Sequence, residues 1–94
     1  MRRLAWDASF RRAFKRRTRN KAAFRDRILQ VVTKLAEDPF DPALRSHKLS
    51  GQLKGLWSCW VEYDCRIVFA FEPDPDAREA MIVLVDFGTH DEVY

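Results

Sequence analysis

The chain has 94 residues, of which 47% are hydrophobic and 33% charged, with 3 Gly, 4 Pro and a net charge of +3. This length and composition predict a single globular domain over residues 1–94 and exclude a low-complexity or repeat protein. The longest apolar runs, residues 67–71 and 80–85, are too short to cross a bilayer, and Asp7 interrupts any N-terminal signal core, so we expect a cytoplasmic protein.

A short strand followed by a helix is predicted at the start of the chain. Residues 3–6 favour a strand, and either Asp7 or Ser9 can cap the helix that follows. Apolar side chains recur at the helical spacing i, i+3, i+4, at Phe10, Ala13 and Phe14. Arginines and lysines fall on the other side of this helix, so one face is apolar and the other basic.

A second helix is predicted after Asn20, which can serve as its cap. Its apolar stripe has a 3.6-residue period and comprises Phe24, Ile28, Val31, Val32 and Leu35. The helix should stop at Asp38, because a residue that precedes proline is disfavoured in the helical conformation. The two helices would form a hairpin with an apolar inner face.

Basic charge is concentrated in this first half. Residues 1–46 hold 13 Lys or Arg and 5 Asp or Glu, a balance of +8, whereas residues 47–94 hold 4 and 9, a balance of −5. Such a cluster indicates an anionic partner, with nucleic acid first, although a solvated helix face has the same composition. The candidate RNA-binding residues are Arg11, Arg12, Lys15, Arg16, Arg17, Arg19, Lys48 and Lys54.

Three strands are predicted after a turn-rich connection over residues 39–55. Residues 56–63, 66–71 and 80–87 are rich in aromatic and β-branched side chains, and short links favour an antiparallel meander. Strict alternation would place Met81, Val83, Val85 and Phe87 on one face of the last strand, and Ile82, Leu84 and Asp86 on the other. The predicted fold is α+β: a strand, a two-helix hairpin and a three-stranded meander, with one sheet face left for a second cover or a binding surface.

Polar side chains gather in three stretches, residues 45–51, 62–66 and 88–94. They meet if the first loop packs over the open side of the sheet. Together they would supply the groups for metal-free RNA cleavage: a base for the ribose 2′-hydroxyl, a cation for the phosphate and an acid for the leaving oxygen. Histidine exchanges protons near neutral pH, and arginine fits phosphate oxygens. The candidates are His47, Asp64, Arg66, His90 and Tyr94.

Each candidate also has a purely structural interpretation. Loop histidines are commonly solvated, Asp64 suits a turn, and Arg66 can pair with a nearby carboxylate. Trp57 and Trp60 would then pack in the sheet rather than stack on RNA bases. Neither a metal site nor a redox pair is supported, because the histidines and the two cysteines lack the spacing of ligands, and no cofactor is expected.

The order of elements, the segment HKLSGQLKGLWSCWVEYDCRIVF and the terminal GTHDEVY resemble the RelE/ParE toxin superfamily, and within it the YafQ-like branch. The resemblance covers nearly the whole chain. It implies a toxin of a type II toxin–antitoxin system that cleaves mRNA on the ribosome without a metal and is inhibited by a cognate antitoxin.

The resemblance also implies roles for individual residues. His47 and Asp64 match a catalytic histidine and aspartate, Arg66 matches a phosphate-binding arginine, His90 matches a late histidine, and Tyr94 matches a terminal aromatic residue. His90 would be the general acid, and His47 or Asp64 the general base. The chain departs from the branch at Trp60, where YafQ-like toxins have a further histidine, and tryptophan cannot transfer protons.

The sequence leaves two other functions open. The superfamily includes toxins that act on DNA gyrase without cleaving RNA, and the fold alone does not decide between the activities. An inactive toxin, kept as a module that binds antitoxin or RNA, is the other alternative.

Overall fold

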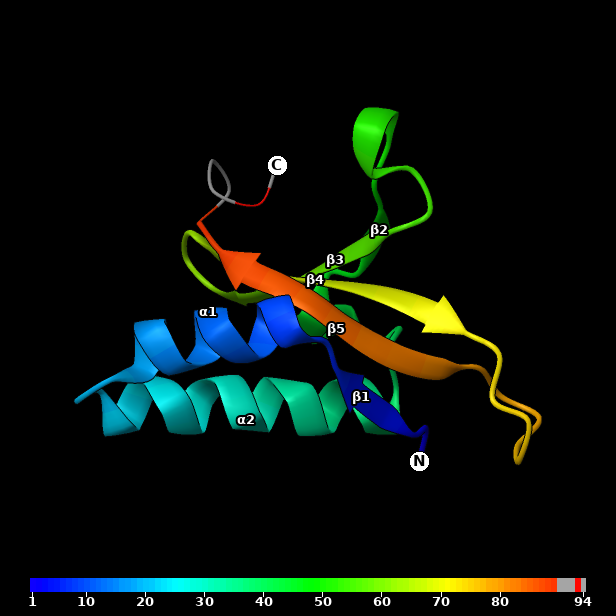
Figure 1. Ribbon diagram of the computed structural model, residues 1–94, viewed down its shortest axis with the longest axis horizontal. Helices are drawn as coiled ribbons and strands as arrows, with labels where there is room; N and C mark the ends of the chain where they lie inside the picture. Colours follow the sequence, from blue (N-terminus) through cyan, green and yellow to red (C-terminus); the bar gives the residue numbers. More distant parts are fainter. Residues whose placement is uncertain (90–92, 94) are drawn as a thin grey trace.

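The structure, a computed structural model, describes residues 1–89 and 93 and combines two α-helices with a five-stranded sheet (Figure 1). In chain order the elements are β1 (Leu4–Trp6), α1 (Ala8–Thr18), α2 (Ala22–Glu37), η1 (Pro42–Leu44), β2 (His47–Lys48), η2 (Gly51–Leu53), β3 (Trp57–Glu62), β4 (Cys65–Glu72) and β5 (Met81–Gly88). The α+β class, the helical hairpin and the meander predicted from the sequence are confirmed.

The strands lie in the order β1-β5-β4-β3-β2. The meander β3-β4-β5 and the β2–β3 pair are antiparallel, whereas β1 pairs with β5 in parallel, with Leu4 opposite Ile82. The two-residue strand β2 was not predicted, because it lies within a segment whose turn residues indicate a loop. It extends the sheet at the edge where His47 is located.

Both α-helices pack against one face of the sheet, and we call the opposite face the open face (Figure 1). The predicted stripe of α2 is confirmed: Ile28, Val31, Val32 and Leu35 are buried against strand residues such as Ile67 and Phe69. On α1 the buried residues are Phe10 and Ala13, with Phe14 half-buried. Helix α2 ends at Glu37, before Pro39, as predicted.

The second helix begins two residues later than its predicted cap. Asn20 adopts a left-handed conformation with φ 58°, and Lys21 occupies the cap position without a side-chain hydrogen bond. Asparagine tolerates positive φ better than most residues, and here that property makes the tight turn between the helices. The prediction that Asn20 caps α2 is therefore wrong.

A β-bulge changes which side chains of β5 face the helices. The register of β4 and β5 shifts between Val68 and Phe69, which lie opposite Asp86 and Leu84 respectively, so Val85 is the extra residue. Ile82, Leu84 and Phe87 consequently share the core, with 0%, 0% and 2% of their surfaces exposed. The prediction of strict alternation, which placed Phe87 on the other face from Ile82 and Leu84, is therefore wrong. An extra residue in a strand turns every later side chain to the other face of the sheet.

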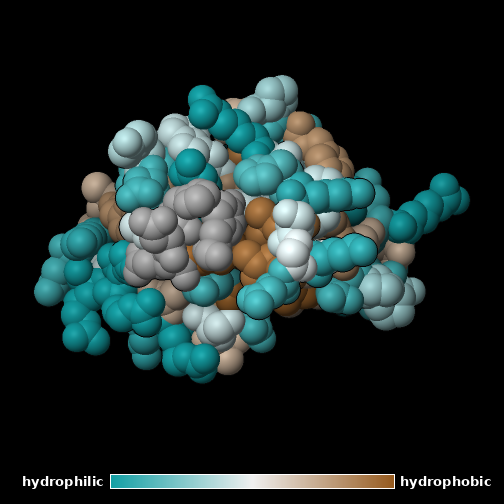
Figure 2. Space-filling model, turned by 90° about the horizontal axis from the view of Figure 1, so that it is seen from above, coloured by the Kyte–Doolittle hydropathy of each residue, from teal (hydrophilic) through white to brown (hydrophobic). Residues whose placement is uncertain are grey.

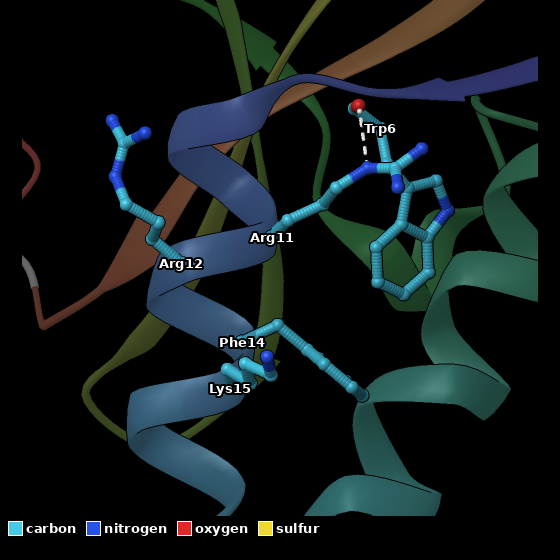
Figure 3. Close-up of a pocket in the computed structure, with 5 residues that line it drawn as sticks. All are labelled: Trp6, Arg11, Arg12, Phe14 and Lys15. Carbon is cyan, nitrogen blue, oxygen red and sulfur yellow. Dashed lines mark hydrogen bonds between the residues drawn. The ribbon is translucent and has the colours of Figure 1, made fainter.

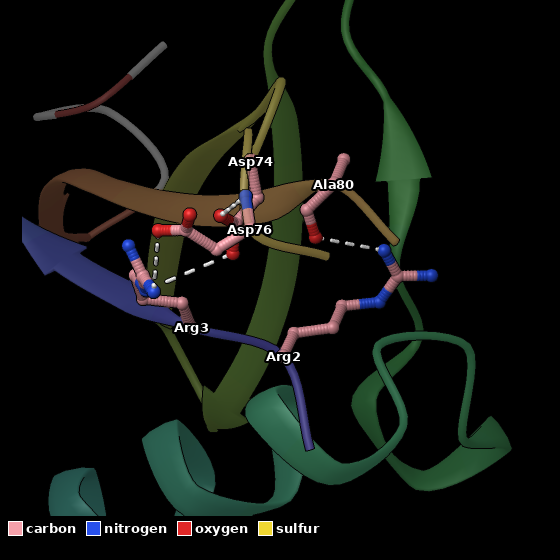
Figure 4. Close-up of polar contacts among 5 residues, drawn as sticks. All are labelled: Arg2, Arg3, Asp74, Asp76 and Ala80. Carbon is pink, nitrogen blue, oxygen red and sulfur yellow. Dashed lines mark hydrogen bonds and ion pairs between the residues drawn. The ribbon is translucent and has the colours of Figure 1, made fainter. Parts of the chain in front are cut away.

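Arginines near the N-terminus tie β1 to the loop between β4 and β5 (Figure 4). The Arg3 guanidinium contacts Asp74 at 3.7 Å and Asp76 at 3.3 Å, and the Asp74 side chain is almost fully buried. Arg2 donates to the Ala80 carbonyl at 2.9 Å. These contacts hold the ends of β4 and β5 in register beside the edge strand.

The two cysteines are buried free thiols. Burial raises the pKa of Cys59 to about 12 and that of Cys65 to about 11, because the charged thiolate is poorly solvated in the core. The negative charge of Glu62 raises the Cys65 pKa further, while the positive charges of Arg17 and Arg66 oppose it. Arg17 of α1 therefore lies near the turn between β3 and β4.

The bulge predicts an asymmetry between two neighbouring substitutions. Phe87→Ala should lower the free energy of unfolding by about 3–5 kcal/mol, because it removes a buried aromatic ring and leaves a cavity. Val85→Ala should cost less than about 1 kcal/mol, because Val85 is only half-buried. Urea unfolding of both variants measures the difference. Similar small losses for the two variants would mean that β5 alternates without a bulge, because Val85 and Phe87 would then share the face opposite Ile82 and Leu84.

Candidate active site on the open face of the sheet

The strand registers align polar side chains in two neighbouring rows across the open face. Residues paired across adjacent strands point to the same face, so each row can be followed from one edge inward. The first row runs His47, Ser58, Val68, Asp86, and the second runs Trp60, Arg66, Gly88. Figure 2 looks onto this face and shows hydrophobic atoms at its centre between hydrophilic side chains. Ser58 and Val68 are buried and form the floor.

A compact loop holds His47 at the edge of this face. The Asp41 carboxylate accepts a hydrogen bond from the Ala43 N–H at 2.8 Å and starts the η1 turn, and the Ser46 hydroxyl donates to the Pro39 carbonyl at 2.6 Å. Arg45 ends η1 in a left-handed conformation with φ 51°. This conformation is uncommon for a residue with a side chain and reverses the chain direction before β2.

The Arg45 carbonyl also selects the tautomer of the His47 ring. His47 Nδ1 lies 3.1 Å from this oxygen. A carbonyl can only accept a hydrogen bond, so Nδ1 carries the proton, and in the neutral ring Nε2 keeps its lone pair. Since the His47 side chain is exposed, Nε2 can accept a proton from a bound molecule.

Arg66 lies in the row next to that of His47 and is half-buried. Its Nη1 donates to the backbone carbonyls of Glu62 at 3.4 Å and Cys65 at 3.3 Å. Both hydrogen bonds come from the same nitrogen, and their acceptors at the turn between β3 and β4 orient the guanidinium plane. A planar guanidinium held in this way is suited to bind phosphate oxygens.

Asp64 lies in the turn that joins β3 to β4 rather than in either row. With φ 60° it occupies the left-handed position of a two-residue hairpin turn, where aspartate is among the preferred residues. The Glu62–Cys65 pair separates it from the row that contains Arg66. The structure thus brings His47 and Arg66 onto adjacent rows and leaves exposed Asp64 at the end of the hairpin.

Two of the predicted residues, His90 and Tyr94, lie outside the described part of the chain. Strand β5 ends at Gly88, directly beside Arg66 in the second row.

Asp86 was not among the predicted site residues. The bulge turns it onto the open face in the same row as His47, and its carboxylate accepts a hydrogen bond from the Phe87 N–H at 2.8 Å. Period-two alternation assigned it to the opposite face together with Ile82 and Leu84. Nothing in the local sequence marks the bulge, so this residue could not have been found from the sequence pattern.

The two tryptophans of β3 lie on opposite faces. Trp57 packs with Phe69 and Phe71 on the helix side, as the structural interpretation predicted. Trp60 instead lies half-buried on the open face, where the Arg45 guanidinium carbon sits 5.0 Å from its ring centre. Both tryptophans thus lie in the sheet, but only Trp57 joins the helix-side core, whereas Trp60 keeps part of its ring exposed on the open face.

Helix α1 presents most of the predicted RNA-binding residues to solvent. Arg11, Arg12, Lys15, Arg16 and Arg19 are exposed, and Arg17 is half-buried. Lys48 lies over the Trp57 ring on the helix side of the sheet, with Nζ 5.8 Å from the ring centre. Together with Lys54 it lines a groove of about 410 Å³ at the β2–β3 connection.

A larger groove lies along α1 (Figure 3). It measures about 630 Å³ and is lined by Trp6, Arg11, Arg12, Phe14 and Lys15. Trp6 and Phe14 supply apolar rings, and the Arg11 Nε donates to the Trp6 carbonyl at 3.2 Å. The lining therefore combines an aromatic floor with three cations and contains no acidic residue.

Metal ligands do not come together in the part of the chain that the structure describes: no group of three His, Cys, Asp or Glu side chains forms a site there. Neither of the two described α-helices has the length and apolar character needed to cross a bilayer.

A model of the YafQ family, bacterial toxins of type II toxin–antitoxin systems, matches residues 2–94. Among solved structures, a YoeB/ParE toxin from Agrobacterium tumefaciens is 18% identical, covers 94% of this chain and 98% of its own, and gives a TM-score of 0.77. YafQ from E. coli strain BL21(DE3) is 18% identical, with coverages of 100% and 99% and a TM-score of 0.75. The E. coli DinJ–YafQ toxin–antitoxin complex is 16% identical, with coverages of 99% and 97% and a TM-score of 0.74. No curated protein sequence matches the chain.

The contact between Arg45 and His47 predicts the tautomer of the His47 ring. Nitrogen-15 NMR of the neutral protein should show the proton of His47 on Nδ1, because the carbonyl can accept a hydrogen bond only from a protonated nitrogen. The same ring in urea-unfolded protein, where this contact is lost, provides the comparison. A proton found on Nε2 in the folded protein would contradict the assignment.

Proposed function

Because the chain belongs to the YafQ family of bacterial toxins of type II toxin–antitoxin systems, we propose that it is an endoribonuclease that cleaves mRNA on the ribosome. The observation that supports the proposal is the placement of His47 one row from the Arg66 guanidinium, with His47 Nδ1 facing the Arg45 carbonyl and therefore Nε2 as the nitrogen for which we propose the role of base. The two groups share the open face of the sheet, which a single RNA strand can reach.

The proposed reaction needs no cofactor or metal. His47 Nε2 removes the proton from a ribose 2′-hydroxyl, and the 2′-oxygen bonds to the adjacent phosphorus. The bond from phosphorus to the 5′-oxygen breaks, and that oxygen takes a proton from the general acid, for which we propose His90. The products are a 2′,3′-cyclic phosphate and a free 5′-hydroxyl.

The remaining candidates are assigned supporting roles. Arg66 stabilises the charge that develops on the phosphoryl oxygens. Asp64, exposed at the hairpin turn, is the alternative base, and Tyr94 stacks on a base or donates a proton. The exposed cations of α1 bind RNA phosphates and hold the toxin on the ribosome.

We further propose a cognate antitoxin as the protein partner. The solved E. coli complex pairs YafQ with DinJ, and the present chain offers a groove whose aromatic floor and cationic rim fit an acidic segment with apolar anchors (Figure 3). An antitoxin bound there covers the same cations that bind RNA. Inhibition would thus follow from competition for one basic surface.

Substitution of the proposed catalytic groups should abolish cleavage without unfolding the protein. After brief induction in a bacterial host, primer extension should show cuts only in a translated transcript. His47→Gln and Arg66→Ala should each reduce these cuts by about 10²–10⁴-fold. Gln30→Ala, an exposed change on α2, is the matched control and should cut like the wild type.

The same experiment separates the alternatives. Growth arrest with intact RNA and damaged DNA would replace the nuclease with a gyrase-directed toxin. Intact RNA without growth arrest would identify an inactive binding module.

Charge reversal along α1 should weaken the antitoxin complex. The triple variant Arg11→Glu, Arg12→Glu, Lys15→Glu should bind the antitoxin about 10²-fold more weakly, because three favourable charge contacts become repulsive. Arg78→Glu, an exposed change in the β4–β5 loop, is the control for a single charge reversal outside the groove and is compared with Arg12→Glu alone. Isothermal titration at low and high salt measures both effects, and an affinity that does not fall with salt would contradict an acidic segment in the groove.

A further inference from the structure

We propose that Trp60 and Arg45 form a platform that holds one nucleobase of the RNA, with the neighbouring phosphate on Arg66. This inference rests on the proposed nuclease function, because it assigns the substrate a position on the open face. It concerns a residue that has no acid–base chemistry and that the proposed reaction does not use.

Trp60 supplies the aromatic ring of the platform. Trp60 lies on the open face of β3, outside the buried core cluster that includes its neighbours Cys59 and Val61. The large apolar ring of Trp60 is therefore partly in water. The ring of Trp57, the other tryptophan of β3, is packed against aromatic rings. A partly exposed aromatic ring beside cations is the arrangement with which sheet proteins stack single-stranded bases.

Arg45 supplies the guanidinium of the platform. Its guanidinium lies over the Trp60 ring at 5.0 Å, and the Arg45 side chain is otherwise exposed. The backbone reaches this place through the left-handed conformation at φ 51°, which is unfavourable for arginine. The guanidinium covers one face of the indole ring, and guanidinium planes themselves stack on bases. A base therefore stacks on the outer side of Arg45, so that base, guanidinium and indole form one column.

Arg66 and His47 place this surface beside the reacting atoms. Arg66 is the direct cross-strand partner of Trp60, and His47 pairs with Ser58, two residues from Trp60 on the same strand and face. Adjacent side chains on one face of a strand are separated by about 7 Å, which is close to the spacing of successive nucleotides in an extended strand. A base held on this Arg45–Trp60 pair thereby positions its phosphate at Arg66 and its ribose toward His47.

Fluorescence of a protein with a single tryptophan tests the platform directly. Trp6→Phe and Trp57→Phe leave Trp60 as the only tryptophan of the full-length chain. A short single-stranded 2′-O-methyl RNA, which cannot be cleaved, should quench the emission of this protein. An abasic oligonucleotide of equal length, which has the phosphates without the bases, should quench little and bind about tenfold more weakly or worse.

Three further variants separate stacking from charge. Trp60→Ala should bind the 2′-O-methyl RNA at least about tenfold more weakly and should not distinguish it from the abasic oligonucleotide. Arg45→Gly removes the guanidinium while glycine keeps the positive φ without strain, and should weaken binding several-fold. Phe40→Ala removes an exposed aromatic ring that contacts Trp57 and Phe71, away from the open face, and should bind normally.

Two outcomes would overturn the platform: equal affinity of the wild type for the two oligonucleotides, or unchanged affinity in Trp60→Ala. If the wild-type protein still cut translated mRNA in that case, the nuclease function would stand and only the role of Trp60 would be wrong. Base-dependent binding without any cleavage would support the platform and reject the nuclease.

Discussion

Burial of aliphatic and aromatic side chains between one face of the sheet and the two helices is the interaction on which the rest of the structure depends. It uses Ile67 and Phe69 of β4 and the stripe of α2, and it fixes which residues of each strand face inward. The outward residues are then determined by the pleat, because neighbours along a strand alternate between faces. The candidate site is therefore the reverse side of the core: His47, Trp60 and Arg66 lie where they do because Cys59 and Ile67 are buried.

Short irregular segments then adjust what the pleat provides. The bulge at Val85 returns Phe87 to the core and sends Asp86 outward, and the left-handed Arg45 turns the loop so that its carbonyl reaches His47 and its side chain reaches Trp60. Both features cost conformational freedom or ladder hydrogen bonds. In this fold they lie beside the polar rows, whereas α2 is regular along its length.

The parts of the fold that were predictable are those in which many residues repeat one period. The 3.6-residue stripe identified α2, and the run of aromatic and β-branched residues over 67–71 identified β4, because each is supported by several buried side chains. Single-residue decisions were not predictable. Asn20 has the side chain of a cap and makes a turn instead, the bulge at Val85 leaves no mark in the sequence, and β2 has only two residues. His47 and Arg66 were identified by chemistry and resemblance, but their shared face depends on the register of β2, which no local pattern encodes.

The pairing of β1 with β5 determines when the chain can finish folding during its synthesis. Leu4 aligns with Ile82, so the first strand cannot be completed until nearly the whole chain has left the ribosome on which it is made. Contacts that distant in sequence slow folding, because a long loop must close before any of them forms. The backbone hydrogen bonds of α1 and α2, in contrast, join near neighbours and can form early, whereas the apolar faces of both helices are buried only when the sheet is present. A nascent chain of this kind exposes its basic hairpin before its open face exists, which leaves an interval in which a partner can bind the surface of α1 ahead of any activity.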